Sequence, residues 1–176
     1  LLGYKGYYIK EYFANYFLHN SDVTFHLQEN RMEVHQKRAE PWHVTLVDTG
    51  DSSMTGGRLA RVAEYIRNEK AFLFTYGDWV ADINIAKSID FHFSHGKLAT
   101  MMATYPPGRF GAVNIEAGYV RAFTEKPKGD GGMINGGFFV LSPQVLELIN
   151  SDLSVWEQEP LMALAARNEL MAFEHQ

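Results

Sequence analysis

The stretch AFLFTYGDWVAD (residues 71–82) carries the pattern that decides the fold. An apolar and aromatic run over residues 71–76 ends at Gly77, and a carboxylate, Asp78, follows it beside Trp79. A short apolar run closed by a glycine predicts a strand buried on both faces in a parallel sheet. Ligands of open α/β sheets bind outside the carboxyl ends of such strands. Asp78 therefore stands where ligand chemistry is expected, although a carboxylate there can equally cap the following turn or helix.

Strand patterns alternate with helical patterns along the rest of the chain. Apolar residues at helical spacing predict helices within residues 5–17, 51–68, 84–96, 143–150 and 157–170. Further strands are expected at residues 1–2, 43–50, 98–105, 133–143 and 170–175, and hairpins at residues 23–37 and 111–123. This order predicts an α/β fold of one domain over residues 1–176, with a Rossmann-like, doubly wound mixed sheet and inserted β-hairpins.

Composition restricts the class of protein. The 176 residues carry a formal net charge of -5, and no cluster of Lys and Arg provides a nucleic-acid footprint. The chain has no cysteine, which excludes a disulfide framework and a thiolate site and fits a reducing compartment. No transmembrane run or signal peptide is recognised. We therefore expect a cytoplasmic protein that handles small molecules and binds neither nucleic acid nor a membrane.

Three stretches place glycines or polar groups at strand ends and loops. They are TGGR (residues 55–58), expected as a glycine-containing loop that could cradle a ligand, YGDWVAD (76–82) and TEKPKGDGGMINGG (124–137). The two glycines inside the last strand indicate close approach of a ligand or of another backbone segment. Lys126 is held by Pro127, and a compact ammonium suits a phosphate. An isolated lysine in a turn is, however, more often a solvated side chain.

The histidines give a weaker signal. His92 and His95 lie three residues apart on a predicted helix and could share a metal ion, but the sequence nearby offers no third ligand. We expect this pair to form a solvated helix face. No Gly-x-Ser-x-Gly elbow, Walker loop or Gly-x-Gly-x-x-Gly fingerprint occurs, so hydrolases and dinucleotide enzymes are poorly supported.

A family resemblance adds what spacing leaves open. The strings GYKGYYIKEYF, EPWHVTLVDTGDSSMTGGRLARV, FLFTYGDWVAD, PPGRFGAVNI, FTEKPKGDGGMINGGFFVLSP, WEQEPLMALA and ELMAFEH together resemble the glucose-1-phosphate cytidylyltransferase (CDP-glucose pyrophosphorylase) family. GD and EKP alone would indicate only the broader sugar-phosphate nucleotidyltransferase superfamily. The long strings VDTGDSSMTGGRL and WEQEPLMAL narrow the resemblance to the cytidylyl branch.

The resemblance implies a nucleotide-diphospho-sugar transferase fold and an enzymatic activity. CTP and α-D-glucose 1-phosphate would give CDP-glucose and pyrophosphate, for the dideoxysugars of bacterial O-antigen. Because two polyanions must meet, such a site supplies cations and fixed dipoles rather than covalent chemistry. Asp78 would be a Mg²⁺ ligand, with the metal bridging carboxylate and phosphate oxygens.

The same resemblance assigns roles to further residues of this sequence. Lys126 would hold the phosphate of glucose 1-phosphate, and Glu125 would lie near the sugar hydroxyls. Asn135 and Gly136 would lie against the hexose, where a side chain on Gly136 would obstruct its approach. The nucleotide side would be formed by Thr55, Gly56, Gly57 and Arg58.

This sequence also departs from the family pattern. The Gly-rich loop with its Gly-Thr-Arg element and the second metal-binding aspartate are missing from residues 1–176, so we expect an incomplete domain with little or no activity by itself. Trp79 stands where relatives carry glycine, and its ring is expected either to pack into apolar neighbours or to narrow the cleft. Alternatives are a UTP-dependent or other nucleotidyltransferase and a non-catalytic sugar-phosphate-binding module. The family also implies a homo-oligomer, a hexamer by resemblance.

Overall fold

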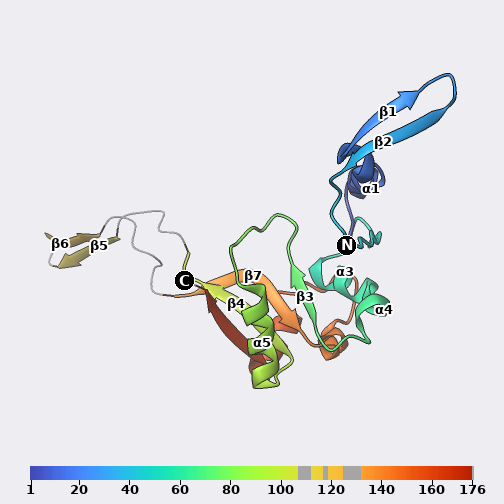
Figure 1. The fold of residues 1–176 in the computed structure, drawn as a ribbon. Helices are drawn as coiled ribbons and strands as arrows, with labels where there is room; N and C mark the ends of the chain where they lie inside the picture. Colours follow the sequence, from blue (N-terminus) through green and yellow to red (C-terminus); the bar gives the residue numbers. More distant parts are fainter. Residues whose placement is uncertain (107–111, 117–118, 125–131, 176) are drawn as a thin grey trace.

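A four-stranded mixed sheet forms the centre of the molecule. The computed structural model describes residues 1–106, 112–116, 119–124 and 132–175. Within them the strand order is β3-β7-β4-β8 (Figure 1), with β7 antiparallel to both β3 and β4, and β4 parallel to β8. These strands are β3 (Phe72–Thr75), β4 (Ala99–Thr104), β7 (Ile134–Leu141) and β8 (Leu170–His175). The mixed sheet predicted from the sequence is therefore confirmed.

The environment predicted for the first quoted strand is wrong. β3 lies at the edge of the described sheet and pairs with β7 in the antiparallel direction. Phe72 is buried in the core, whereas the neighbouring Leu73 points away and is 53% exposed. A continuous apolar run does not distinguish a central strand from an edge strand whose outer face is lined by a helix and loops.

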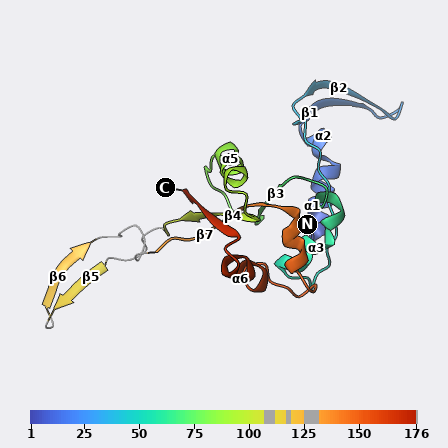
Figure 2. The same ribbon diagram turned by 90° about the horizontal axis from the view of Figure 1, so that it is seen from below.

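Helices cover both faces of the sheet. α5 (Ile85–His95) and α6 (Glu159–Ala166) lie on opposite sides of β4 and β7 (Figure 2). Asn84 caps α5 by accepting the Lys87 N–H at 3.0 Å, and Gly96, with φ +66°, ends it in the left-handed conformation. The doubly wound arrangement is confirmed.

The main hydrophobic core lies where the sheet meets α3 (Thr55–Arg61), α4 (Ala63–Ile66), α6 and the 3₁₀ helix η1 (Pro143–Leu148). Trp156 is fully buried there and packs edge-to-face against Phe74 and Phe139, with ring centroids 6.0 and 5.9 Å apart. Around these rings the core contains Leu59, Val62, Phe72, Ala99, Leu141, Val145 and Leu164. The core therefore anchors the residues just before α6 against the carboxyl half of β3.

Two hairpins project away from the sheet (Figure 1). The first, β1 (Ser21–His26) with β2 (Arg31–Lys37), follows the helices α1 (Gly6–Ala14) and α2 (Tyr16–His19). The second pairs β5 (Ala112–Glu116) with β6 (Tyr119–Thr124). Both hairpins were predicted from period-two alternation and are confirmed. None of the helices in the described part of the chain is long and apolar enough to cross a membrane.

The strand expected at residues 43–50 does not form. Leu2 and Asp48 make an isolated parallel bridge, in which Leu2 N–H donates to the Val47 carbonyl and Thr49 N–H donates to the Leu2 carbonyl, both at 2.8 Å. The strand expected at residues 1–2 consists of this bridge alone. The bridge has a local effect, because it fixes the fully buried Thr49 beside the start of α3.

Candidate active site

Three strand ends meet at one edge of the sheet. β3, β4 and β8 run in the same direction, so their carboxyl ends lie at the same edge as the amino end of β7. Asp78 lies exposed in the turn that follows β3, and Asn135 stands at the start of β7. The loop that carries Asp78 is tied to β8 because His175 Nε2 and Asp82 Oδ1 are hydrogen-bonded at 2.9 Å. Strand ends of this kind are where α/β sheets bind ligands.

A carboxylate that sequence reasoning did not single out organises this edge. Glu157 Oε2 accepts a hydrogen bond from Thr55 Oγ1 at 2.9 Å, and its Oε1 accepts one from the Tyr76 hydroxyl. The Asn135 side chain lies near the Tyr76 hydroxyl and lowers its pKa. The structure thus brings two predicted site residues, Thr55 and Asn135, to the same cluster. Glu157 lies inside the string WEQEPLMAL, which was the available sequence signal.

Tyr76 is held in its protonated form. Burial is the largest cause of a raised Tyr76 pKa, and the hydrogen bond to Glu157 and the negative charge of that carboxylate raise it further. The nearby Asn135 side chain opposes these effects only in part. The Tyr76 hydroxyl is therefore a permanent donor to Glu157 at neutral pH.

The predicted glycine loop is the first turn of helix α3. The Gly56 and Gly57 N–H groups both donate to the Ser154 carbonyl, at 2.9 and 3.2 Å. A Cβ on Gly57 would lie 2.1 Å from the Asp152 carbonyl oxygen, so a side chain there would collide with backbone. These glycines are explained by the close approach of residues 152–154, and their amides are already engaged within the protein.

Arg58 points from α3 back toward the start of the chain. Its Nη1 donates to Thr49 Oγ1 at 2.9 Å and its Nη2 to the Asp51 carbonyl at 3.2 Å. The guanidinium passes so close to Gly3 that a Cβ on that glycine would lie 2.2 Å from Nη1. The described structure thus places Arg58 in a packed position, apart from the Glu157 cluster.

The two glycines at the start of β7 have different neighbours. A Cβ on Gly136 would lie 2.3 Å from Met102 Cε, so the close approach at this position comes from Met102 of β4. Gly137 has φ +75°, and a Cβ there would lie 2.4 Å from Trp79 Cε3. The Trp79 ring therefore lies against the Gly137 backbone and beside Tyr76, with ring centroids 5.7 Å apart, and stays 42% exposed. One side of the Trp79 ring packs as expected, and the other side faces solvent.

Comparison with known proteins identifies the family. A family model described as nucleotidyl transferase matches residues 14–174. The chain is 74% identical, over 98% of its length, to the glucose-1-phosphate cytidylyltransferase of Salmonella typhi. The chain belongs to the nucleotidyl transferase family. The resemblance to the cytidylyltransferase branch is confirmed, and a probable glucose-1-phosphate cytidylyltransferase of Bacillus subtilis is 39% identical over 99% of the chain. The chain spans 67% and 68% of the length of these two relatives.

Solved structures support the nucleotidyl transferase fold. HddC from Yersinia pseudotuberculosis matches with a TM-score of 0.58 at 19% identity, covering 98% of this chain and 67% of that one. A putative glucose-1-phosphate thymidylyltransferase from Bacillus anthracis matches with a TM-score of 0.52 at 16% identity, covering 76% of this chain and 58% of that one. At these identities the likeness establishes the fold alone.

Two of the predicted site residues, Glu125 and Lys126, lie outside the described residues. The element that follows them, β7, starts at Ile134 at this edge of the sheet, and the element that precedes them, β6, ends at Thr124 in the second hairpin. Their roles stay predictions.

The donor set suits a metal ion that is shared with a ligand. Among the described residues, no three His, Asp or Glu side chains gather as a protein-only metal site. Asp78 offers one exposed carboxylate at the strand end. Mg²⁺ commonly takes one or two carboxylates and completes its shell with phosphate oxygens and water. The side chain present therefore fits a Mg²⁺ ion that arrives with a nucleotide.

The histidine pair differs from the expectation. His92 is 2% exposed, and the pair is engaged in hydrogen bonds rather than solvated. Both rings contact Thr100 Oγ1, His92 through Nδ1 at 3.0 Å and His95 through Nε2 at 2.7 Å. The prediction of a solvated face was wrong because α5 turns this face toward β4 and covers it.

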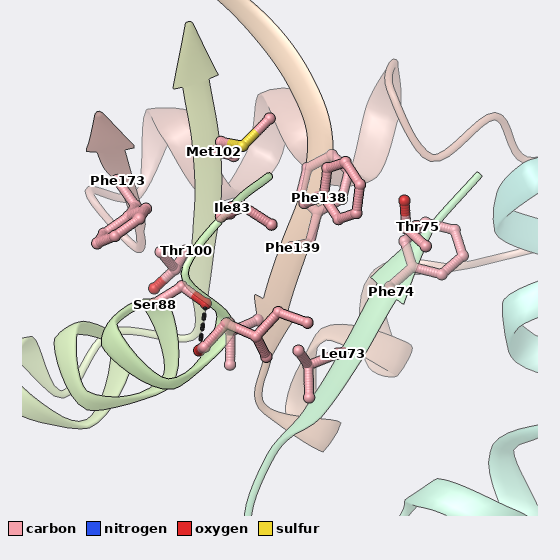
Figure 3. Close-up of a pocket in the computed structure, with 12 residues that line it drawn as sticks. Leu73, Phe74, Thr75, Ile83, Ser88, Thr100, Met102, Phe138, Phe139 and Phe173 are labelled. Atoms are coloured by element: carbon pink, nitrogen blue, oxygen red, sulfur yellow. Dashed lines mark hydrogen bonds between the residues drawn. The ribbon is translucent and has the colours of Figure 1, made fainter. Parts of the chain in front are cut away.

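An apolar cavity of about 170 Å³ lies between α5 and the sheet (Figure 3). Side chains of several elements surround it, among them Leu73, Met102 and Phe173. None of the described residues that line it is charged. A phosphate would lose its hydration there without an opposite charge, so this cavity does not suit a phosphate ligand.

Proposed function

We propose that this chain transfers the cytidylyl group of CTP to α-D-glucose 1-phosphate, forming CDP-glucose and releasing pyrophosphate. The observation that carries the proposal is the 74% identity over 98% of the chain to a glucose-1-phosphate cytidylyltransferase. The arrangement of Asp78, Asn135 and Thr55 around one edge of the sheet supports it. We also propose that residues 1–176 belong to a single nucleotidyltransferase domain.

The reaction needs positioning and charge compensation. A phosphate oxygen of glucose 1-phosphate forms a bond to the α-phosphorus of CTP while the bond from that phosphorus to the bridging oxygen of pyrophosphate breaks. In the proposed arrangement the Asp78 carboxylate would hold Mg²⁺, which would supply positive charge to the phosphate oxygens. We assign the nucleotide side of the site to the first turn of α3, where Thr55 offers its hydroxyl and Gly56, Gly57 and Arg58 form the packed turn that positions it.

The sugar phosphate is assigned to the opposite side. We assign the phosphate of glucose 1-phosphate to Lys126 and the hexose hydroxyls to Glu125, Asn135 and Gly136. The Asn135 side chain is suited to this contact because its amide is already oriented by the Gly137 N–H, which donates to Asn135 Oδ1 at 2.8 Å. A preoriented polar group loses little conformational entropy when it binds a hydroxyl.

A wider assignment extends this proposal. We propose that the product enters bacterial O-antigen synthesis, that the protein works in the cytoplasm, where CTP is made, and that it assembles as a homo-oligomer. Analytical ultracentrifugation tests the last of these, and a monomer at all concentrations would contradict it.

Pyrophosphate release tests the activity. The assay uses the completed chain, meaning residues 1–176 extended at both ends with the flanking segments of the Salmonella typhi relative. With Mg²⁺ and glucose 1-phosphate, we expect turnover to be faster with CTP than with UTP, ATP or GTP, and to stop when the metal is chelated. Equal rates with all four nucleotides, or no turnover with glucose 1-phosphate, would overturn the assignment.

Lys126 is tested in the same assay. Lys126→Met is expected to raise KM for glucose 1-phosphate, because the methionine side chain keeps the length but removes the charge that holds the phosphate. Lys70→Met, at a lysine outside the carboxyl edge, is the matched control. Unchanged kinetics for glucose 1-phosphate in Lys126→Met would remove this residue from the site.

A further inference from the structure

Glu157 stands between the two sides of the proposed active site. Its Oε2 receives the Thr55 hydroxyl from the first turn of α3, and its Oε1 receives the Tyr76 hydroxyl from the end of β3. Those donors are separated from Glu157 by 102 and 81 positions in the sequence. The preceding residue, Trp156, is fully buried in the core, so the backbone that carries the Glu157 carboxylate is fixed in place.

The Thr55 hydroxyl has a fixed orientation because of this contact. It donates its proton to Glu157 and accepts the backbone N–H of Trp156 at 2.9 Å. A hydroxyl that both donates and accepts at well-defined distances has one rotamer and one proton position. One lone pair of the Thr55 oxygen stays available for another donor. Glu157 therefore determines how the nucleotide side of the site presents Thr55.

The other arm of the cluster reaches the sugar side. The Tyr76 hydroxyl donates to Glu157, and the Asn135 side chain lies near enough to lower the Tyr76 pKa. Asn135 Oδ1 accepts the Gly137 N–H at 2.8 Å, and Thr75, next to Tyr76, donates its hydroxyl to the Gly137 carbonyl at 2.9 Å. The end of β3 that Glu157 holds through Tyr76 is therefore joined to the backbone that orients Asn135.

We propose that Glu157 is a positioning residue that couples the nucleotide side of the site, through Thr55, to the sugar side, through Tyr76 and Asn135. Its carboxylate contributes as a double acceptor and contacts neither substrate. The proposal rests on the function proposed above. It adds a link between the two half-sites, so that the geometry of one depends on the geometry of the other.

The substitutions can break the link as a whole or one arm at a time. Glu157→Gln keeps the side-chain shape but replaces one acceptor oxygen with an NH₂ donor, so one of the two hydroxyls loses its acceptor. Tyr76→Phe removes the arm to Asn135, and Thr55→Val removes the arm to α3. Thr55→Ser keeps the hydroxyl. Glu169→Gln is the matched control, because Glu169 also joins two groups, Lys97 Nζ at 3.4 Å and Leu98 N–H at 3.1 Å, at the opposite edge of the sheet.

The experiment measures kcat and both KM values of the completed chain and these variants with CTP, glucose 1-phosphate and Mg²⁺. We expect Glu157→Gln to lower kcat/KM about 10- to 100-fold for both substrates, as a displacement of positioned groups does. Tyr76→Phe should raise KM mainly for glucose 1-phosphate and Thr55→Val mainly for CTP. Thr55→Ser should recover most of the CTP binding that Thr55→Val loses, and Glu169→Gln should stay within about twofold of wild type.

The possible outcomes test the proposed function and the role of Glu157 separately. A completed wild-type chain without cytidylyltransferase activity would overturn the proposed function and this inference with it. An active wild type in which Glu157→Gln behaves like Glu169→Gln would overturn the inference alone. Equal KM changes for both substrates in Tyr76→Phe and Thr55→Val would also overturn it, because a merely structural role loosens the two half-sites together.

Discussion

The two edges of the central sheet carry polar clusters that differ in charge and in exposure to solvent. At the carboxyl edge of β3, the cluster centres on the Glu157 carboxylate, and the exposed Asp78 and half-exposed Trp79 stand beside it. At the other edge, His92 and His95 of α5 meet Thr100 of β4 under cover of the helix. The first cluster is charged and open to solvent, and the second is uncharged and covered.

One backbone donor determines the direction of every hydrogen bond in the histidine cluster. Lys97 N–H donates to His95 Nδ1 at 2.9 Å, so the neutral His95 carries its proton on Nε2 and donates it to Thr100 Oγ1. The Thr100 hydroxyl then donates to His92 Nδ1, and His92 Nε2 donates to Ser142 Oγ at 3.2 Å. Because each ring nitrogen has a partner, this cluster stabilises the packing of α5 and leaves no group free for a ligand. A polar cluster therefore indicates chemistry where donors or charge remain available.

Removing the shared hydroxyl should have the largest effect on stability. Thr100→Val leaves His92 Nδ1 and His95 Nε2–H without their partner in a covered site, so we expect the free energy of unfolding to fall by about 2–4 kcal/mol. Chemical denaturation measures it. Thr104→Val, the same replacement at the other end of β4, is the control and should change stability by less than about 1 kcal/mol. Similar losses for the two variants would contradict a special role for Thr100.

The histidine cluster should also make stability depend on pH. Burial is the main cause that lowers the pKa of both histidines below 6.5. The neighbouring His95 lowers the pKa of His92 further. Lys97 lowers the pKa of His95 further, and Glu169 opposes that shift. Below pH 6.5 the unfolded chain therefore binds protons that the folded chain does not, and stability falls as the pH drops, by at most about 1.4 kcal/mol per pH unit for each histidine.

Denaturation between pH 7.5 and pH 5 checks this pH dependence. A double variant, His92→Gln with His95→Gln, should show a flatter profile, and His43→Gln, at an exposed position, should keep the wild-type slope. A wild-type stability that rises as the pH falls from 6.5 would contradict the neutral cluster.

Trp79 should have a smaller effect, divided between stability and binding. Because its ring is 42% exposed, Trp79→Gly should lower the free energy of unfolding by about 1–2 kcal/mol, less than the roughly 3 kcal/mol or more expected for a fully buried tryptophan. The ring covers Gly137 beside Asn135, so KM for glucose 1-phosphate should also shift several-fold in the completed chain. Trp42 is 63% exposed and lies between β2 and α3, so Trp42→Gly should leave both KM values unchanged. Wild-type values of stability and KM in Trp79→Gly would show that the ring has neither role.

Local pattern predicted most of the fold but little of the clusters. Period-two alternation and glycine positions suffice for the two hairpins and for the end of α5 at Gly96, because those features depend on neighbouring residues. The i, i+3 spacing of His92 and His95 shows that they share a helix face but contains no information on which strand covers it. Glu157 contacts Thr55 across 102 positions, and no single-sequence pattern encodes such a pair.

The sequence did not predict the edge position of β3, for a related reason. Its apolar run resembles a central strand because Phe72 faces the core while Leu73 lines the apolar cavity under α5. The turn after it was predicted better, because a strand end followed by glycine and aspartate is a local feature. Asp78 accordingly lies at the edge where the sequence placed it.

The most direct test of the open, charged edge as the active site compares two aspartates. Pyrophosphate release from CTP and glucose 1-phosphate is measured for the completed chain, for Asp78→Asn and for Asp90→Asn, which changes an exposed carboxylate on α5. Loss of a key electrostatic group should lower kcat about 100-fold or more in Asp78→Asn and should increase the Mg²⁺ concentration needed for half-maximal rate. Asp90→Asn should retain the wild-type rate. An Asp78→Asn enzyme with wild-type kcat and wild-type Mg²⁺ dependence would contradict the account.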